Sequence, residues 1–491
     1  MRILLAGSTL LALTMPLQAQ APSSNQIDII VKEAMARWKA PGLAVAIVHQ
    51  DRLIYLKGLG VKELGKNDPV TQDTVFPLAS CSKALTVTAL AMLVDDGKLT
   101  WDDPVRKHLP WFKLKDPCAD SNVTLRDLLT HRTGLGKHEP LWFKTPWTME
   151  ERARRLAFLD PSYSFRSTFE YQAIAYGTAG LAGAQAARTT WEEFIEKRLF
   201  TPLEMKTASA AFPGAGKADF ASPHKRRGQG IAVLERYPLE IPDPAGSIHA
   251  SARDLSKFLR LQLGGGMWQS RRLVAENSLR ETQTPQITIP LADFSAVMNP
   301  HSHVLCYTLG WIAQDYRGRW TLMHGGTVDG FRAQLTLVPD MQLGIALLNN
   351  LDRTWMNLAL SNTLVDRFCQ LPEKDWNDYY HAVQDEEDRL AKAHLDRMRA
   401  SRKPNTKPSL ALPAYAGAYA DPAYGTCRVS VEEDGLHWEW GNIHSRLEHF
   451  HFDTFLAVEE PVDNLSLTFQ LGEQGTVASV RVMERTFRKR P

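Results

Sequence analysis

Residues 77–96 read PLASCSKALTVTALAMLVDD, a stretch in which a serine precedes a run of apolar residues at helical spacing. Ser80 and Lys83 lie three positions apart at its start. Because residues i and i+3 share a face of a helix, the predicted helix over residues 80–96 brings the two side chains together. The N-terminus of that helix would also place positive potential at Ser80. A serine hydroxyl needs an adjacent base to become a nucleophile, and Lys83 can serve if burial keeps it neutral part of the time.

A second serine with a lysine three residues later occurs at Ser222 and Lys225. This pair lies in a basic loop beside Pro223, and no helical pattern follows to hold its geometry. We therefore interpret Ser222 as a chance occurrence of the spacing. For Ser80 itself, the alternative interpretation is a structural N-cap serine.

Strand patterns lie on both sides of a long helical region, from which we expect a mixed α/β (α+β) fold. A sheet built from both ends of the first 370 residues, with helices between, satisfies this order. A Pro-Asp turn at Pro339 separates two of the later strands. The strands are predicted at residues 43–48, 52–59, 320–323, 332–338 and 343–348, and flanking helices at 27–38 and 355–368.

The C-terminal part has a different pattern. Residues 373–403 are highly charged and helical in pattern, and residues 404–413 are rich in proline, which together indicate a linker. Short strands separated by turn residues follow beyond Tyr415. They predict a small antiparallel β module, with strands at residues 427–432, 436–440, 454–458, 465–470 and 477–483.

Composition and the N-terminus limit the partners and the compartment. The 57 basic and 55 acidic residues give a formal charge of +2, which indicates no nucleic-acid partner. Arg2, an apolar run and small residues up to Ala19 are typical of a signal peptide over residues 1–19, so we expect a periplasmic or secreted protein. No later segment is long enough to span a membrane. Five widely spaced cysteines permit a disulfide and require none.

Several motifs, in a fixed order, resemble the serine β-lactamase and penicillin-binding-protein superfamily over residues 27–370. Within it, they fit the branch of class C β-lactamases, family VIII esterases and D-aminopeptidases. The resemblance implies a β-lactamase-like antiparallel sheet flanked by helices, with a helical subdomain and an acyl-enzyme formed on Ser80. The motifs are DTVF at 73–76, SCSKALT at 80–86, VTLRDLLTHRTGL at 123–135, AGSI at 245–248, TLGW at 308–311 and HGGTVDGF at 324–331.

The second motif of that family is a tyrosine with an asparagine two residues later. FEYQAIAYGTAG at residues 169–180 fits this frame, so the resemblance assigns the general base to Tyr171 and makes Tyr176 a packed aromatic. A phenol near a lysine loses its proton more easily, which is the property that this role needs. Ala173 occupies the place of the asparagine, which in relatives holds the amide on the acyl side of the substrate. A standard β-lactamase pocket is therefore not expected.

The third motif corresponds to His324, Gly325 and Gly326. The resemblance implies an oxyanion hole made by the backbone N–H groups of Ser80 and Thr327, with Gly325 and Gly326 at the substrate. His324 would supply polarity or positive charge beside Tyr171. Arg332 is a candidate for binding a substrate carboxylate, although a solvated arginine is the preferred interpretation.

The C-terminal stretch resembles the lipocalin-like module appended to some of these hydrolases, which would cap the cleft or aid assembly. Its match rests on AYAGAY at residues 414–419 and on DTF at 453–455. The expected organisation is a signal peptide at residues 1–19, a hydrolase domain at 20–372, a linker at 373–413 and the β module at 414–491.

We thus expect a serine hydrolase that uses Ser80, Lys83, Tyr171 and His324 and needs neither a metal ion nor an organic cofactor. A peptidase or amidase acting on D-amino-acid-containing or non-standard peptides is the preferred hypothesis. Carboxylesterase activity is the alternative, followed by β-lactamase activity and by peptide binding without turnover. The expected partner is a small peptide or ester substrate. We expect no nucleic-acid partner and no membrane span, and the sequence leaves open whether the protein forms a homo-oligomer.

Overall fold

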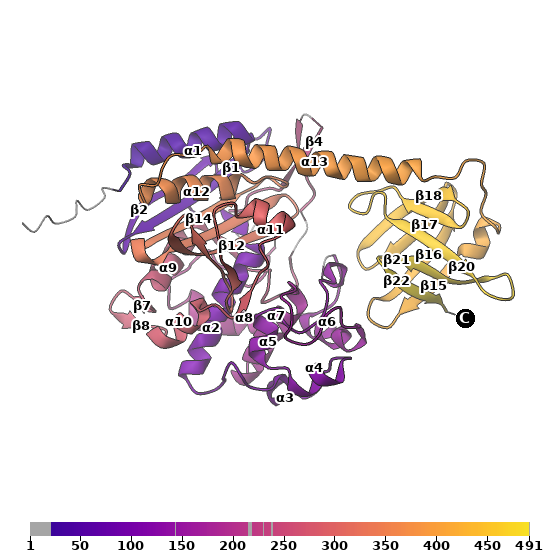
Figure 1. The fold of residues 1–491 in the computed structure, drawn as a ribbon, viewed down its shortest axis with the longest axis horizontal. Coiled ribbons are helices and arrows are strands. Elements are labelled where there is room, and N and C mark those ends of the chain that lie inside the picture. The colour runs from indigo at the N-terminus through magenta and orange to yellow at the C-terminus, as the bar shows by residue number, and fades with distance from the viewer. Residues whose placement is uncertain (1–20, 143, 215–218, 229, 237–238, 491) are drawn as a thin grey trace, which may run out of the picture.

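A computed structural model describes residues 21–142, 144–214, 219–228, 230–236 and 239–490. The predicted signal peptide lies outside these residues. Figure 1 shows a larger mixed unit and a smaller all-β unit, with the long helix α13 (Trp376–Ala400) running from the first towards the second.

The larger unit is built on one antiparallel sheet, as the sequence predicts. Its strand order is β2-β1-β14-β13-β12-β11-β10-β9. The two ends of the unit meet where Leu43 pairs with Asn349, so strands from opposite ends of this unit are neighbours in the sheet. The strands are β1 Gly42–His49, β2 Arg52–Gly60, β9 Ile287–Thr288, β10 Leu305–Tyr307, β11 Ile312–Tyr316, β12 Arg319–Val328, β13 Phe331–Val338 and β14 Leu343–Asn349.

Helices cover both faces of this sheet, which explains why every residue of β1 is buried. One face carries α1 (Ser24–Trp38), α12 (Met356–Phe368) and the first turns of α13, where Trp376 and Tyr380 are fully buried. The other face carries α2 (Ser82–Asp95) and α9 (Ala252–Leu263). The site described below therefore lies in a three-layer core.

Between α2 and the late strands, the chain forms a helical subdomain and several short pairs of strands. A small sheet of β3 (Val75–Pro77) and β6 (His249–Ser251) leads the chain into the start of α2. The remaining elements of this region are α3 Val105–His108, α4 Pro117–Asn122, α5 Leu125–Leu129, α6 Met149–Arg155, α7 Ala173–Ala186, α8 Trp191–Ile195, β4 His224–Arg227, β5 Gly230–Val233, β7 Met267–Trp268, β8 Arg271–Arg272, α10 Glu276–Gln283 and α11 Asp293–Met298.

The C-terminal unit is a closed barrel of eight strands, in which β22 pairs with β15 and leaves no free edge. Aromatic side chains fill it, including Tyr415, Phe455 and Phe469, whose ring centroids lie 5.0–5.7 Å apart. Its strands are β15 Gly417–Asp421, β16 Gly425–Glu432, β17 Gly435–Trp440, β18 Ile443–His451, β19 Thr454–Ala457, β20 Ser466–Leu471, β21 Val477–Val482 and β22 Arg485–Lys489.

The barrel touches the helical subdomain at two of its turns. The backbone N–H of Asn442 donates to the carbonyl of Lys144 at 2.9 Å, and the Arg155 guanidinium donates to the carbonyl of Ala423 at 2.9 Å. Trp147 packs edge-on against Trp440 with 5.8 Å between ring centroids. These contacts bring the barrel against the segment around residues 138–155.

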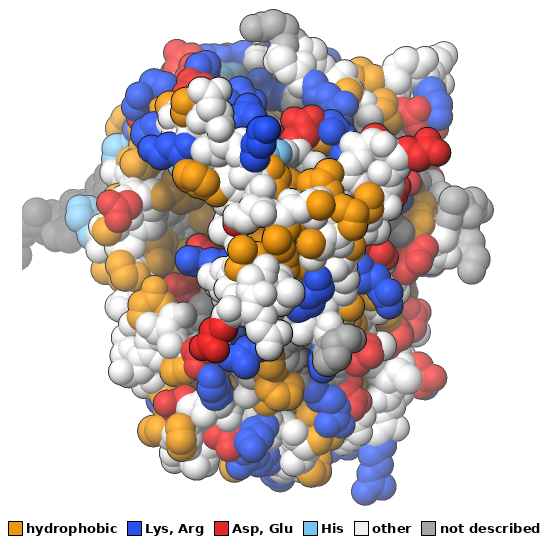
Figure 2. Space-filling view, turned by 90° about the vertical axis from the view of Figure 1, so that its right-hand side faces the viewer, with side chains coloured by type: hydrophobic (Ala, Val, Ile, Leu, Met, Phe, Trp, Pro, Cys, Tyr) orange, Lys and Arg blue, Asp and Glu red, His pale blue; other side chains and the backbone are white. Residues whose placement is uncertain are grey.

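The described ranges hold no helix suited to spanning a membrane, and the barrel side of the molecule carries side chains of both charges. No helix in the described ranges combines the length and apolar character that crossing a bilayer requires. Figure 2 shows the barrel side of the molecule, where acidic and basic side chains both occur among apolar ones.

The five cysteines are all unpaired, and Cys81 donates its thiol proton to the carbonyl of His324 at 3.1 Å.

Strand β12 lies so close to the start of α2 that one glycine has no room for a side chain. A Cβ atom on Gly326 would lie 2.1 Å from the Leu78 carbonyl oxygen, whereas one on Gly325 would meet only the Gln334 side chain, at 3.4 Å. We predict that Gly326→Ala lowers the free energy of unfolding by about 1–3 kcal/mol, because the backbone must move apart. Thermal melting measures this, with Gly325→Ala as the matched control. Equal melting temperatures for the two variants would contradict the close approach.

Candidate active site

Ser80 lies on a tight turn between β3 and α2. The turn, Ala79–Cys81, is a short 3-10 helix, so the α-helix begins at Ser82 and not at Ser80 as the sequence predicts. Ala79 has a φ of 46°, a left-handed conformation that costs an alanine about 1–3 kcal/mol. This turn holds the half-buried Ser80 just before the N-terminus of α2, where it lines a cavity.

Lys83 is fully buried directly behind Ser80. Its Nζ lies 3.4 Å from Ser80 Oγ and donates to the carbonyl oxygen of Ala245 at 2.9 Å. Among the described residues it forms no ion pair. Burial lowers the pKa of Lys83 to about 7, although the negative charge of Asp243 acts in the opposite direction. A neutral amine beside Ser80 is therefore available near neutral pH.

Tyr171 lies on the other side of Lys83, with its ring centroid 4.8 Å from Nζ. Its hydroxyl is buried and makes no hydrogen bond of good geometry with the described residues. Burial raises the pKa of Tyr171 well above its usual value, and the nearby Ser80 hydroxyl offsets only part of that rise. The structure thus differs from the expectation that Lys83 makes this phenol easier to ionise. Desolvation disfavours the charged forms of both side chains.

His324 projects from β12 into the same site and is buried. Its Nδ1 donates to the Gly325 carbonyl at 2.8 Å, so its Nε2 accepts from the Tyr307 hydroxyl at 3.1 Å. Burial, together with the charge of Lys83, lowers the pKa of His324 to about 3. Of the two roles expected for His324, polarity fits this geometry and positive charge does not.

The cavity in front of Ser80, here called the cleft, measures about 540 Å³ and also contacts Tyr171, His324 and Thr327. Thr327 is exposed on β12 and lines the cleft together with Gly325 and Gly326, so the two residues expected to form the oxyanion hole line one space. One wall of the cleft is apolar and comprises Phe169, Ile289, Phe294, Met298, Leu305 and Met323.

Arg332 also lines the cleft, but it is not a solvated arginine as the sequence analysis prefers. Its Nη1 lies 2.5 Å from Asp352 Oδ1, and only 17% of its side chain is exposed. The buried position on β13 beside an acid explains the difference, because a buried guanidinium requires a counter-charge. An arginine neutralised in this way is a weak site for a substrate carboxylate.

The missing asparagine has no replacement from the neighbouring side chain. Ala173 opens α7 and lines the cleft with a methyl group. Gln172 points away as the N-cap of the helix, where its Oε1 accepts from the backbone N–H of Ala175 at 2.7 Å. Neither Ala173 nor the Gln172 oxygen is therefore available to bind an amide group of a substrate in the cleft.

Two further residues, His131 and Tyr307, contact the predicted site residues, although the sequence assigned neither of them a role. His131 accepts from the backbone N–H of Gln172 at 3.1 Å, and its ring centroid lies 4.3 Å from that of Tyr171. Tyr307 holds His324, as described above. The motif at residues 123–135 already contained His131, but the sequence offered no signal for its contact with Tyr171.

Ser222 is remote from this arrangement. Its hydroxyl donates to Glu63 at 2.8 Å, and Lys225 pairs with Glu460 of the barrel at 3.3 Å. The two side chains are thus committed to different acids, which agrees with their interpretation as a chance spacing.

A second cavity of about 700 Å³ lies where the cleft meets the barrel. Thr327, Trp142 and Glu139 line both cavities, and the barrel contributes Trp440, Ile443 and Met483 to the second. The barrel is therefore one wall of the space that leads to Ser80.

Comparisons with known proteins agree with this geometry. The β-lactamase family matches residues 27–366, and a family described as a domain of unknown function (DUF3471) matches residues 401–490. Unguisins hydrolase ungD' of Aspergillus campestris is 26% identical over 84% of this chain and 79% of its own length. Protein flp of Staphylococcus aureus is 24% identical over 68% of this chain and 64% of its own length.

Solved structures show the same fold. An octameric penicillin-binding protein homologue from Pyrococcus abyssi aligns with a TM-score of 0.61 and 20% identity, over 94% of this chain and 99% of its own. A class C β-lactamase from Rhodobacter sphaeroides aligns with a TM-score of 0.58 and 22% identity, over 70% of this chain and 100% of its own. Together with the match over residues 27–366, these findings show that the chain belongs to the β-lactamase family and is a serine hydrolase.

Proposed function

We propose that this serine hydrolase cleaves peptides at an amide bond, with a preference for D-amino-acid-containing or other non-standard peptides. The observation that carries the mechanism is the buried Lys83 amine at 3.4 Å from Ser80 Oγ. Neutral Lys83 takes the proton of Ser80, whose oxygen attacks the substrate carbonyl. The backbone N–H groups of Ser80 and Thr327 stabilise the oxyanion. Tyr171 protonates the leaving amine and regains its proton from Lys83, and water then releases the acyl group by the reverse proton path.

Two features support a peptide substrate. The cleft in front of Ser80 and the barrel-lined cavity that adjoins it together offer the room that an extended substrate requires. A relative that aligns over 84% of this chain is named as a hydrolase of unguisins.

Carboxylesterase activity is the second candidate. Ala173 provides no side-chain amide for an acyl-side amide of the substrate, and an ester without such a group loses nothing by that absence. The same feature disfavours β-lactam substrates.

We also propose export to the periplasm or the medium. The support is the sequence of residues 1–19, with a basic start, an apolar run and a small-residue exit at Ala19.

A fluorophosphonate probe should label Ser80 and no other serine. Ser80 Oγ loses its proton and attacks phosphorus, and fluoride leaves, which adds the mass of the probe less that of HF to the exported protein. We predict a single adduct on the wild type and on Ser222→Ala, and none on Ser80→Ala. The same intact mass reports the N-terminus, which is Gln20 if cleavage follows Ala19. Absence of an adduct on folded wild type, or a label on Ser222, would contradict the mechanism.

The labelling rate should rise with pH and level off above a midpoint near 7, because the protonated form of Lys83 cannot accept the proton of Ser80. We predict that Lys83→Arg, which stays charged, reduces the plateau rate by about a hundred-fold or more. His324 is not the source of this midpoint, since its pKa is about 3. A flat profile between pH 5 and pH 9, measured with stopped labelling, would show that Lys83 is not the base.

A substrate panel separates the two candidate activities. We predict that kcat/KM is higher for D-aminoacyl p-nitroanilides than for their L-isomers and for simple p-nitrophenyl esters, and that nitrocefin is a poor substrate. Ser80→Ala supplies the background rate. If the enzyme hydrolyses the esters but neither the D- nor the L-aminoacyl anilides, the esterase proposal replaces the peptidase proposal.

A further inference from the structure

The carbonyl that holds Lys83 belongs to a tight turn over residues 243–247. Ala245 accepts from Lys83 Nζ, while the next carbonyl back, that of Pro244, accepts from the Thr86 hydroxyl at 2.6 Å. The turn is thus bound to α2 at two successive peptide groups. Any shift of the turn would remove the acceptor that positions the catalytic amine.

Asp243 fixes this turn from within. Its Oδ1 accepts from the backbone N–H of Ala245 at 2.8 Å, which orients the peptide unit leading to the Ala245 carbonyl. Its backbone oxygen accepts from the N–H groups of Gly246 and Ser247, both at 3.0 Å. The Asp243 side chain therefore binds the N–H group of the same residue whose carbonyl oxygen contacts Lys83.

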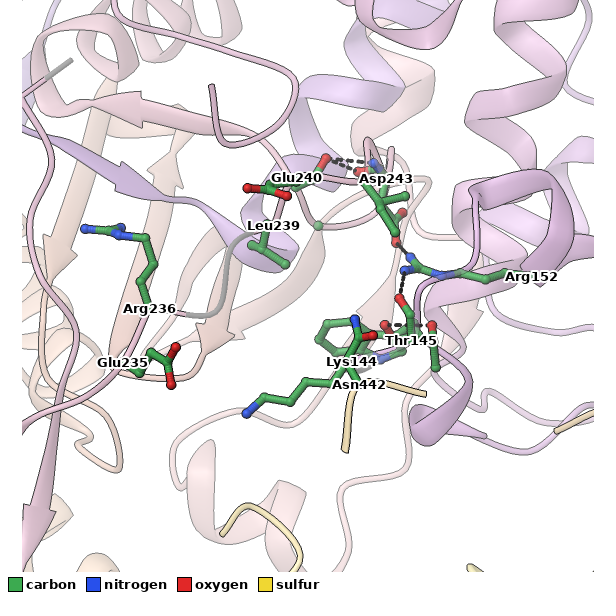
Figure 3. Close-up of a pocket in the computed structure, with 13 residues that line it drawn as sticks. Lys144, Thr145, Arg152, Glu235, Arg236, Leu239, Glu240, Asp243 and Asn442 are labelled. Carbon is green, nitrogen blue, oxygen red and sulfur yellow. Dashed lines mark hydrogen bonds and ion pairs between the residues drawn. The ribbon is translucent and has the colours of Figure 1, made fainter. Parts of the chain in front are cut away.

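Arg152 in turn holds Asp243. Figure 3 shows the Arg152 side chain extending from its helix to Asp243, with a second contact to Thr145. Arg152 Nη1 lies 3.3 Å from Asp243 Oδ2, and Nη2 donates to the Thr145 carbonyl at 3.4 Å. The two residues are only 3% and 6% exposed, so water screens their charges weakly.

Asp243 is also the only carboxylate among the described groups whose charge acts on Lys83. Burial, together with the charge of Lys83, lowers the pKa of the neighbouring His131 and His324, so both imidazoles stay neutral. The polar groups that face Lys83 from the surrounding elements are Ser80, Cys81, His131, Tyr171, Tyr176, His324 and, through the turn, Asp243.

We propose that Asp243, held by Arg152, is a positioning residue that fixes the Ala245 carbonyl against Lys83 and sets how readily Lys83 releases its proton. The two effects are separable, because the hydrogen bond to Ala245 needs only an oxygen acceptor and the electrostatic effect needs the charge. Arg152 moderates the electrostatic effect by pairing with the same carboxylate. This inference rests on the proposed acylation of Ser80 by way of Lys83.

The pH profile of Ser80 labelling by a fluorophosphonate tests it. Asp243→Asn keeps an oxygen for Ala245 and removes the negative charge that favours protonated Lys83. The midpoint should therefore move to lower pH, by about half a unit to one unit. Asp243→Ala loses the acceptor as well, and its plateau rate should be about ten- to a hundred-fold lower than that of Asp243→Asn.

Arg152→Gln should move the midpoint in the opposite direction, to higher pH, because Asp243 then faces Lys83 without its counter-charge. Arg154→Gln is the matched control on the same helix. Arg154 pairs with Glu150 at 2.7 Å on the surface, so its loss should leave the profile unchanged. Circular dichroism and melting curves establish that each variant is folded.

The outcomes separate this inference from the proposed function. Failure of the wild type to label at Ser80 overturns the function itself. A labelled wild type whose midpoint is the same in Asp243→Asn and Arg152→Gln leaves the function standing and overturns the role of Asp243, as does an upward shift in Asp243→Asn. If Asp243→Asn does not fold, the direction of the shift in Arg152→Gln decides.

Discussion

The burial of Lys83 beside Ser80 is the constraint on which the rest of the site depends. A fully buried ammonium is costly unless a counter-charge accompanies it, and the fold supplies a carbonyl oxygen and two aromatic rings in place of a direct carboxylate partner. The neutral amine is therefore the form that the surroundings favour. Tyr171 and His324 are buried in the same space, so their ionised forms are disfavoured too. In the proposed mechanism, protons therefore move between groups whose neutral forms the surroundings favour.

The architecture packs closely around the buried Lys83. The sheet joins strands from both ends of the larger unit, and β12 presses its backbone against the turn that carries Ser80 at Gly326. Cys81 binds the same strand through the His324 carbonyl. The strain at Ala79 is tolerated because the surrounding contacts determine the conformation of the turn. The barrel adds a wall beyond the cleft without contributing a residue to the proton path.

Much of this could be predicted from the sequence, because periodicity and spacing are local. The SxxK spacing brought Ser80 and Lys83 together, although Ser80 lies on the 3-10 turn before α2. The runs of apolar residues placed the strands at residues 43–48 and 332–338 close to their observed bounds. The barrel strand at Ile443–His451 was missed, because six of its nine residues are polar or charged and it contains only three apolar ones. The acceptor at Ala245, the pairing of Arg152 with Asp243 and the neutral state of His324 could not be predicted. Each depends on burial and on contacts between segments far apart in sequence.

The charge state of Lys83 distinguishes this account from one in which Lys83 is a permanent cation and Tyr171 an ionised base. Desolvation decides between them, since it favours a neutral lysine and a neutral phenol alike. The most direct test is an NMR titration of the protein labelled with ¹³C at the lysine ε-carbons, with Lys83→Arg used to assign the signal. The account predicts that the Lys83 signal titrates near pH 7. A Lys83 signal that titrates together with the exposed lysines, at about pH 10 or above, would contradict it.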